Sequence, residues 1–280
     1  MSTIRAACVQ FSARADKSEN VALMAPLVAE AAGRGADVVL LPEKWNAWMD
    51  GPRLRPLAER IDGGETVDAM AGWARELGIN LIGGSISIVA DDDAIHNVSL
   101  AFDRRGERVA AYTKIHLFDV DVGGFSYRES DGTAPGGDLV TAELDGVTVG
   151  LTVCYDLRFP ELYRALTLDR GARILTIPSN FTLHTGMAHW EVLLRARAIE
   201  NQAFVLATGQ HGTPGGLDKP SYGHSMIIDP WGTVLAQSPE GDGVIVADLD
   251  LDAQRAIRER LPALLHIRPD LYQTTHPAHT

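Results

Sequence analysis

Cysteine is scarce in this sequence: Cys8 and Cys154 are the two cysteines among 280 residues. Two cysteines do not make the disulfide framework of a small secreted domain, and this pair lacks the spacing of a metal site. The N-terminal segment is a poor signal peptide, because the apolar run after Arg5 is short. These features predict a protein of the reducing cytoplasm.

Positively charged residues are also few relative to negatively charged ones. The chain has 25 lysines and arginines against 37 aspartates and glutamates, which gives a formal net charge of −12 at pH 7. Binding to nucleic-acid phosphates or to an anionic membrane surface requires clustered lysine and arginine. No apolar run approaches the length of a membrane span. We therefore expect neither nucleic acid nor a membrane as a partner.

Apolar residues, in contrast, make up 45% of the chain, which is enough for a large core. No low-complexity linker divides the sequence, so we predict a single domain over residues 1–280. A faint internal repeat runs through it. GADVVLLPEKW (35–45) and GARILTIPSNF (171–181) both have Gly-Ala, a charged residue, an apolar run and then a proline. The repeat predicts two halves of similar fold.

Each half is predicted to open with strand, helix, strand, helix, strand. Apolar residues recur every three or four positions in the helical segments, and short β-branched runs bounded by Gly and Pro indicate the strands. INLIGGSISI (79–88) is one such run. Hairpin-like strands are expected to finish both halves, with SMIIDPWGTVLAQ and GVIVADLD closing the second. The helices are expected near residues 18–34, 65–78, 160–171 and 187–202. This pattern predicts an α/β fold of two sheets packed face to face, with helices outside.

Three reactive side chains stand at the ends of strand-like runs. Glu43 follows DVVLLP, Lys114 comes near the end of RVAAYTKIHLF, and Cys154 ends VTVGLTVC. Ligands bind at the carboxyl ends of strands in open α/β sheets, so the three side chains can converge on one pocket. A thiolate is a nucleophile, a lysine can stabilise an oxyanion, and a glutamate can transfer protons. Each residue also has an ordinary interpretation: Cys154 as core packing, Glu43 as a helix cap and Lys114 as a surface residue.

The segments around these residues resemble a known family. LLPEKWN, YTKIHLFDVD and VCYDLRFPEL are similar to the three signature segments of the nitrilase, or carbon–nitrogen hydrolase, superfamily, in the family's order. The resemblance implies an αββα four-layer sandwich with pseudo-symmetric halves. It also implies that Glu43 is the general base, Lys114 the cation at the transition state and Cys154 the nucleophile. A second family glutamate matches Glu129 in FSYRES and would orient Lys114.

The resemblance further implies that no metal or organic cofactor is needed. The histidines give no reason to add a metal, because His184 and His189 are spaced too far apart for one helix face and there is no HExxH. The family resemblance also implies a homodimer or higher homo-oligomer. The apolar stretch ERLPALLHIRPDLY (259–272) offers a contact surface, and we expect the C-terminal tail, residues 262–280, at the subunit contact.

The residues after the nucleophile indicate the branch of the family. CYDLRF (154–159) resembles the omega-amidases and the deaminated-glutathione amidases. We predict an amidase that converts a small carboxylate-bearing amide to acid and ammonia through a thioester acyl-enzyme. Arg158 is expected to bind the substrate's carboxylate through two hydrogen bonds. The Tyr155 backbone N–H is expected to stabilise the oxyanion, and Asn180 and Phe181 are expected to complete the substrate site.

Several alternatives stay open at this point. The specificity of other family branches, for nitriles or N-carbamoyl amides, is one. A thiol hydrolase that pairs Cys154 with a histidine is another, with His116, His184 and His224 as candidates. A third is a binding protein that kept the fold without the activity. Arg158 has its own alternative, an ion pair with a neighbouring acid (Asp156 or Glu161) that braces the start of the next helix.

Overall fold

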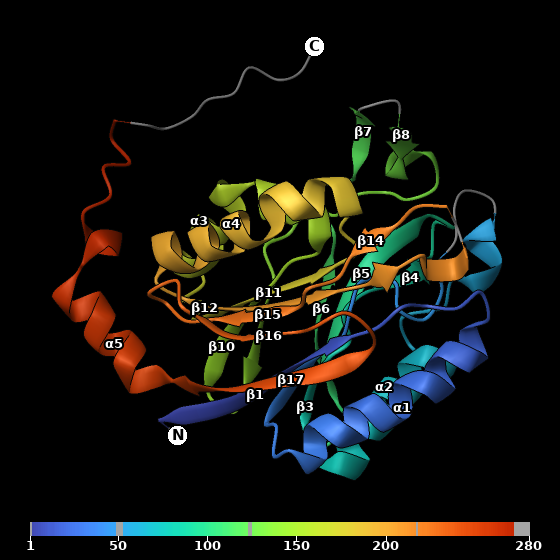
Figure 1. The fold of residues 1–280 in the computed structure, drawn as a ribbon, viewed down its shortest axis with the longest axis horizontal. Coiled ribbons are helices and arrows are strands. Elements are labelled where there is room, and N and C mark those ends of the chain that lie inside the picture. The colour runs from blue at the N-terminus through green and yellow to red at the C-terminus, as the bar shows by residue number, and fades with distance from the viewer. Residues whose placement is uncertain (1, 49–52, 123–124, 217, 272–280) are drawn as a thin grey trace.

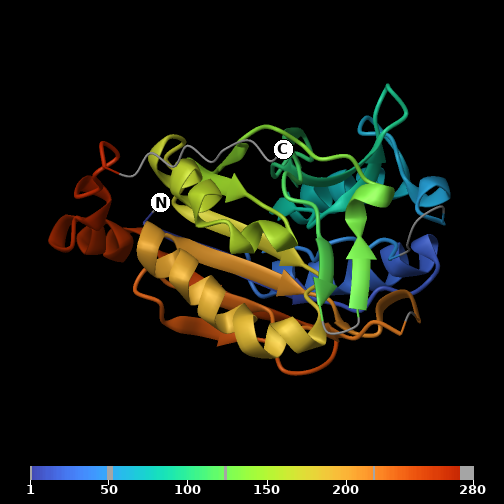
Figure 2. The same cartoon turned by 90° about the horizontal axis from the view of Figure 1, so that it is seen from above.

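Two β-sheets packed face to face form the centre of the molecule. The computed structural model describes residues 2–48, 53–122, 125–216 and 218–271. Helices α1 (Lys17–Gly33) and α2 (Glu65–Leu77) lie outside one sheet, and α3 (Pro160–Leu168) and α4 (Leu183–Asn201) lie outside the other (Figure 1). Two helical layers around two sheets confirm the predicted αββα sandwich. In both views α5 (Leu251–Arg260) lies at one end of the molecule (Figure 1 and Figure 2).

The first sheet has the order β17–β1–β2–β3–β5–β4, with β6 paired to β5. Its strands are β1 (Thr3–Gln10), β2 (Val38–Leu40), β3 (Asn80–Ile82), β4 (Ile86–Val89), β5 (Ile95–Phe102), β6 (Arg108–Thr113) and β17 (Gly243–Asp250). The second sheet has the order β16–β15–β12–β11–β10–β9. Its strands are β9 (Thr141–Leu144), β10 (Val147–Leu151), β11 (Ile174–Ser179), β12 (Phe204–Gly209), β15 (Met226–Ile228) and β16 (Val234–Gln237).

The predicted repeat is present in the topology. Strands β1, β2 and β3 pair in parallel and are joined by α1 and α2. Strands β10, β11 and β12 do the same around α3 and α4. Local signals explain why the helices could be placed. Asp16 caps α1 by accepting the Glu19 N–H, and α2 ends at Gly78, whose φ of 64° is a left-handed conformation that glycine adopts at little cost.

Two strand predictions need correction. GVIVADLD becomes β17, which does not join the β15–β16 hairpin but pairs antiparallel with β1 in the first sheet. It takes the place on β1 that β9 takes on β10. INLIGGSISI is not one strand either, because it breaks at Gly83–Gly84 into β3 and β4. Gly84 has a φ of 62°, and a Cβ at this position would collide with the Pro42 carbonyl, so the strand cannot run straight on.

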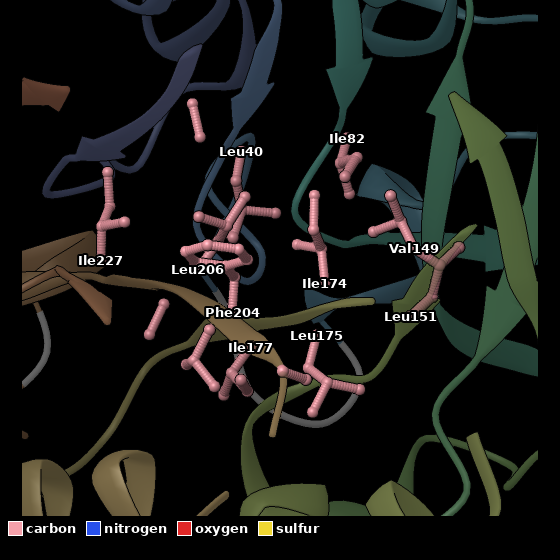
Figure 3. Packing of buried hydrophobic residues seen from close by; sticks show 14 of the residues in the cluster. Leu40, Ile82, Val149, Leu151, Ile174, Leu175, Ile177, Phe204, Leu206 and Ile227 are labelled. Carbon is pink, nitrogen blue, oxygen red and sulfur yellow. The ribbon is translucent and has the colours of Figure 1, made fainter. Parts of the chain in front are cut away.

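The main core lies between the two sheets. Figure 3 shows Leu40 and Ile82 of the first sheet facing the second, which contributes Val149, Ile174 and Leu206. Burial of each such side chain contributes about 1.5–3 kcal/mol. Cys8 belongs to this core, as predicted, and burial raises the pKa of its thiol. The same packing brings the ends of β2 and β11, from different sheets, to one place.

Two short ribbons and five short helical turns complete the described chain, η2 (Arg55–Leu57) and η5 (Pro214–Gly216) among them. The ribbons are β7 (Asp119–Val122) with β8 (Phe125–Arg128) and β13 (His211–Gly212) with β14 (Ser221–Tyr222). The turns that bear on the site are η3 (Glu129–Asp131) and η4 (Cys154–Arg158), while η6 (Ala263–Leu265) follows α5. Of the predicted contact segment at 262–280, residues 272–280 lie outside the described residues. No helix in the described part of the chain has both the length and the apolar character of a membrane span.

Candidate active site

Loops from both sheets converge on one buried cluster. Glu43 follows β2, Lys114 follows β6 and Cys154 opens η4 just after β10. All three side chains are buried, with Cys154 7% exposed. The Lys114 Nζ lies 3.0 Å from the Glu43 Oε1, and both groups act on the Cys154 thiol, which interacts directly with the Glu43 carboxylate. The structure therefore brings together the three residues that the strand ends had indicated.

Glu129 completes an ion-pair network around Lys114. Its Oε2 lies 2.7 Å from the Lys114 Nζ and also accepts the Phe118 N–H at 2.9 Å. Glu43 is held in turn by the backbone N–H of Asn180, which donates to its Oε2 at 2.8 Å. Lys114 thus donates to two carboxylates at once, one on each side. Each carboxylate has a fixed orientation because it accepts bonds through both oxygens.

The network fixes the charge state of the site. Burial alone would raise the pKa of Glu129, but Lys114 and Lys44 lower it to about 2. Burial alone would lower the pKa of Lys114, but the Glu129 and Glu43 carboxylates hold it well above its ordinary value. Burial and the Glu43 carboxylate raise the pKa of the Cys154 thiol, against the opposing effect of Lys114. At neutral pH Lys114 is therefore charged, Glu129 is ionised and the thiol keeps its proton.

Two further residues of the site were not predicted. Asn97, in the middle of β5, is fully buried and its Nδ2 donates to both carboxylates, at 2.9 Å to Glu43 and 3.1 Å to Glu129. Lys44 places its Nζ 3.7 Å from the Glu129 Oε1. Asn97 carries no motif of its own, although an amide in an apolar strand is a buried polar group that requires partners. Lys44 was not singled out from the sequence because it directly follows Glu43, to which the role of the polar residue after the strand had already been given.

The turn that carries Cys154 is held by a buried carboxylate. Cys154 has a φ of 52°, a left-handed conformation that is uncommon for residues other than glycine. Asp156 accepts the Val153 N–H at 2.8 Å and the Tyr112 hydroxyl at 2.7 Å, and it also bonds to His116. These bonds fasten the turn from both sides. The Cys154 side chain therefore projects from a rigid support.

A cavity opens beside the cluster. A small space of about 20 Å³ adjoins Cys154 and leads to an outer cavity of about 440 Å³. The two share Phe118, Thr182 and Thr185 as well as two of the predicted substrate residues, Tyr155 and Arg158. The other two predicted residues, Asn180 and Phe181, line the small space. The structure thus gathers all four predicted substrate residues around Cys154.

Arg158 points into this space rather than toward an acid. Its guanidinium lies over the Phe181 ring, 5.2 Å from the ring centroid, and its Nη1 is 3.2 Å from the His189 Nδ1. In the described part of the chain it makes no ion pair with Asp156 or Glu161. The alternative of a helix brace is therefore wrong for this residue.

The histidines that were candidates for a Cys–His pair lie elsewhere. The His116 Nδ1 is 2.8 Å from Asp156, and its ring stacks on Phe159. His184 lines the outer cavity, as does His189, although their spacing had suggested different helix faces. The His224 ring packs against Tyr222. Among the described residues, no hydrogen bond or ion pair joins a histidine to the Cys154 thiol, and no three His, Cys, Asp or Glu residues are grouped to hold a metal ion.

Known proteins resemble this chain in both sequence and fold. Residues 5–259 match the family described as carbon–nitrogen hydrolase. The chain is 42% identical over 278 residues to a mouse deaminated glutathione amidase, covering 97% of this chain and 85% of that protein. It is 39% identical over 278 residues to the mouse omega-amidase NIT2, covering 97% and 98%. The crystal structure of Saccharomyces cerevisiae Nit3, described as a member of branch 10 of the nitrilase superfamily, superposes with a TM-score of 0.85 at 31% identity, covering 93% of this chain and 95% of that one. The chain belongs to the carbon–nitrogen hydrolase family and is a hydrolase of carbon–nitrogen bonds.

Proposed function

We propose that the protein is an amidase that hydrolyses a small amide bearing a second, ionised carboxylate, with Cys154 as its thiol nucleophile. The buried network of Glu43, Lys114 and Glu129 around the thiol carries this proposal. Two carboxylates, one ammonium and one thiol supply the proton acceptor, the electrostatic support and the nucleophile that acyl transfer requires.

In the first step the Cys154 Sγ attacks the amide carbon while Glu43 accepts the thiol proton. Lys114 and the backbone N–H of Tyr155 stabilise the negative oxygen of the tetrahedral intermediate. Glu43 then passes the proton to the amide nitrogen, the C–N bond breaks, and ammonia leaves behind a thioester. A water molecule, deprotonated by Glu43, attacks the thioester carbon. The thiolate leaves, takes back its proton from Glu43, and the acid is released.

The charge state of the resting site favours this order of events. Because the pKa of the Cys154 thiol is raised, the resting enzyme holds a protonated thiol rather than a stored thiolate. The nucleophile then needs a base within reach at the moment of attack, and the Glu43 carboxylate is in contact with the thiol. Glu129 has a different part, because it contacts Lys114 and orients that ammonium.

The position of Arg158 favours a substrate with a second acid group. A guanidinium binds a carboxylate through two parallel hydrogen bonds, and Arg158 lines the space next to Cys154 without an acidic partner in the described chain. The chain as a whole carries a charge of −12, so attraction of an anion has to come from a local cation. The names of the two mouse relatives, a deaminated glutathione amidase and an omega-amidase, point to the same kind of substrate.

Ammonia release from a small panel of compounds tests the proposal. The panel contains a monoamide of a short dicarboxylic acid, an uncharged amide of the same length, a nitrile and an N-carbamoyl amine. The dicarboxylic monoamide should be hydrolysed with the highest kcat/KM. Cys154→Ala should abolish turnover and keep the fold, whereas Cys8→Ala should turn over at nearly the normal rate. Substantial ammonia release by Cys154→Ala would refute the assignment of the nucleophile.

We also propose that the protein forms a homodimer. Large apolar side chains are exposed along α4, where Met187 is 72% and Val192 68% exposed, and Leu265 in η6 is 83% exposed. A contiguous exposed apolar patch is typical of a surface that a partner covers, and we propose that these side chains belong to one. Sedimentation of the purified protein should give twice the chain mass. Met187→Asp combined with Val192→Asp should reduce that mass to the monomer value, and an unchanged mass would place the contact on another face.

A further inference from the structure

Two buried lysines share the active site. The chain has four lysines, and two of them, Lys44 and Lys114, are each at most 2% exposed. Both contact the same carboxylate, Glu129, one through each oxygen. Burial of an ammonium group is costly unless a partner compensates it. Half of the chain's lysines therefore lie in one buried site, and we look for the reason in the chemistry of that site.

The local fold does not explain the choice of lysine at position 44. Lys44 has a φ of 47°, in the left-handed region that glycine and asparagine adopt more readily. Its backbone N–H donates to the Ser85 carbonyl at 2.7 Å, a bond that any residue other than proline can make. The side chain passes Trp48, with the Nζ 5.6 Å from the ring centroid, and ends beside Glu129. The contacts that depend on lysine itself are the charged ones.

The charge balance of the site supplies the explanation. Glu43 and Glu129 carry two negative charges, and Lys114 by itself supplies one positive charge. Without Lys44 the buried site would be negative before the reaction begins. In the proposed reaction Glu43 takes up the thiol proton, so the net charge is unchanged, but a negative charge moves from Glu43 onto the Cys154 sulfur and then onto the oxyanion. There it depends on Lys114, and the interior of a protein screens such charges weakly. Lys44 makes the resting site neutral.

We propose that Lys44 is a positioning residue that acts through Glu129: its ammonium neutralises this carboxylate, so that the charge of Lys114 remains available to Cys154 and the oxyanion. The inference rests on the proposed function and extends it to the working pH of the enzyme. Among the described residues, the other charged or titratable groups around the site are the Asp156–His116 pair behind the nucleophile turn and, along the cavity, Arg158, His184, His189, Asp218 and Lys219. They are unchanged in every variant considered below.

Three substitutions separate charge from shape. Lys44→Met keeps the length of the side chain and removes the charge, Lys44→Asn removes the charge and suits the left-handed backbone, and Lys44→Arg keeps the charge. The matched control is Lys17→Met, because Lys17 also pairs with a buried glutamate, Glu59, at 3.0 Å. Each variant is examined for the pH dependence of Cys154 alkylation by iodoacetamide, measured by peptide mass, and for the pH profile of kcat/KM for ammonia release.

The two neutral variants should shift the alkylation profile of Cys154 upward by about one pH unit, which is about a tenfold slower reaction at neutral pH. Their kcat/KM should fall by a similar factor, mainly through kcat, and its acid limb should shift in the same direction. Lys44→Arg and Lys17→Met should keep the profiles of the parent protein. Thermal unfolding verifies that each variant is folded.

A neutral variant that folds and keeps the parent alkylation profile would overturn the proposal. So would a Lys44→Arg variant as impaired as Lys44→Met, or an equal shift in Lys17→Met. If neither neutral variant folds, Lys44 is a structural residue and the proposal fails. Alkylation does not depend on the substrate, so this result is distinct from the outcome for the proposed function. An active Cys154→Ala variant would refute that function, whatever the Lys44 variants show.

Discussion

Arg158 is the residue on which substrate choice is expected to depend. Its guanidinium lies at the space beside Cys154, next to aromatic rings rather than carboxylates. Arg158→Leu should raise KM for a carboxylate-bearing amide by about one to two orders of magnitude, as loss of a charge-assisted contact of about 1.5–3 kcal/mol implies. Steady-state kinetics on an uncharged amide of equal length provides the control. If both substrates lose equally, Arg158 supports the loop and does not select the substrate.

The proposed catalytic residues show what a sequence can identify. Glu43, Lys114 and Cys154 stand at strand ends, where a polar side chain after an apolar run is conspicuous, and family resemblance added Glu129. Lys44 and Asn97 could not be identified in this way. Asn97 lies inside a strand, and its two partners are 54 and 32 residues away along the chain. A hydrogen bond across such separations depends on tertiary packing, which no local pattern encodes.

At the scale of elements, η4 is the turn that sets the position of Cys154, the proposed nucleophile. Asp156 is fully buried and accepts bonds from Val153, Tyr112 and His116. Asp156→Asn should lower both kcat and the free energy of unfolding, the latter by about 1–3 kcal/mol, because one acceptor is replaced by a donor that faces other donors. Denaturant unfolding and kcat measured together test this. Asp169→Asn at the exposed end of α3 is the control, and normal kcat in a folded Asp156→Asn would show that the turn keeps its shape without the carboxylate.

The positions of some helices and strands follow from the local sequence, whereas those of others depend on tertiary contacts. The parallel strands and their helices were predicted because apolar periodicity acts within a few residues, although α4 starts at Leu183, four residues before the expected 187. The partner of β17 was predicted wrongly because strand pairing is decided by the open edge of β1, which is more than 230 residues away in sequence at every position of the register. The break at Gly84 follows from the approach of the Pro42 carbonyl, another contact that forms only in the folded chain.

At the scale of the whole molecule, the site forms where the two sheets meet. Glu43, Asn97 and Lys114 come from the first sheet, whereas Cys154 and Asn180 come from the second. The bond from the Asn180 N–H to Glu43 crosses between the sheets. Packing of the halves therefore assembles the proposed catalytic cluster and at the same time buries its charges. Stability and activity should share a dependence on the ionisation of these groups.

Acid unfolding is where this dependence can be measured. Lys114 and Lys44 lower the pKa of Glu129 from the ordinary 4.5 to about 2 in the folded protein. A carboxylate with a depressed folded-state pKa contributes stability that is fully present above pH 4.5 and is lost as the pH falls toward 2. The shift corresponds to about 3 kcal/mol.

Denaturant unfolding of the parent protein between pH 6 and pH 2 should show this loss, in addition to the contributions of other acids. Glu129→Gln should be less stable at pH 6, because Lys114 and Lys44 lose a charged partner, and its stability should fall less steeply with acid. Glu65→Gln, at an exposed glutamate of α2, controls for the removal of one carboxylate. If the free energy of unfolding depends equally on pH in Glu129→Gln and in the parent protein, Glu129 is not ionised in the folded state. Glu129 would then carry a proton within the network.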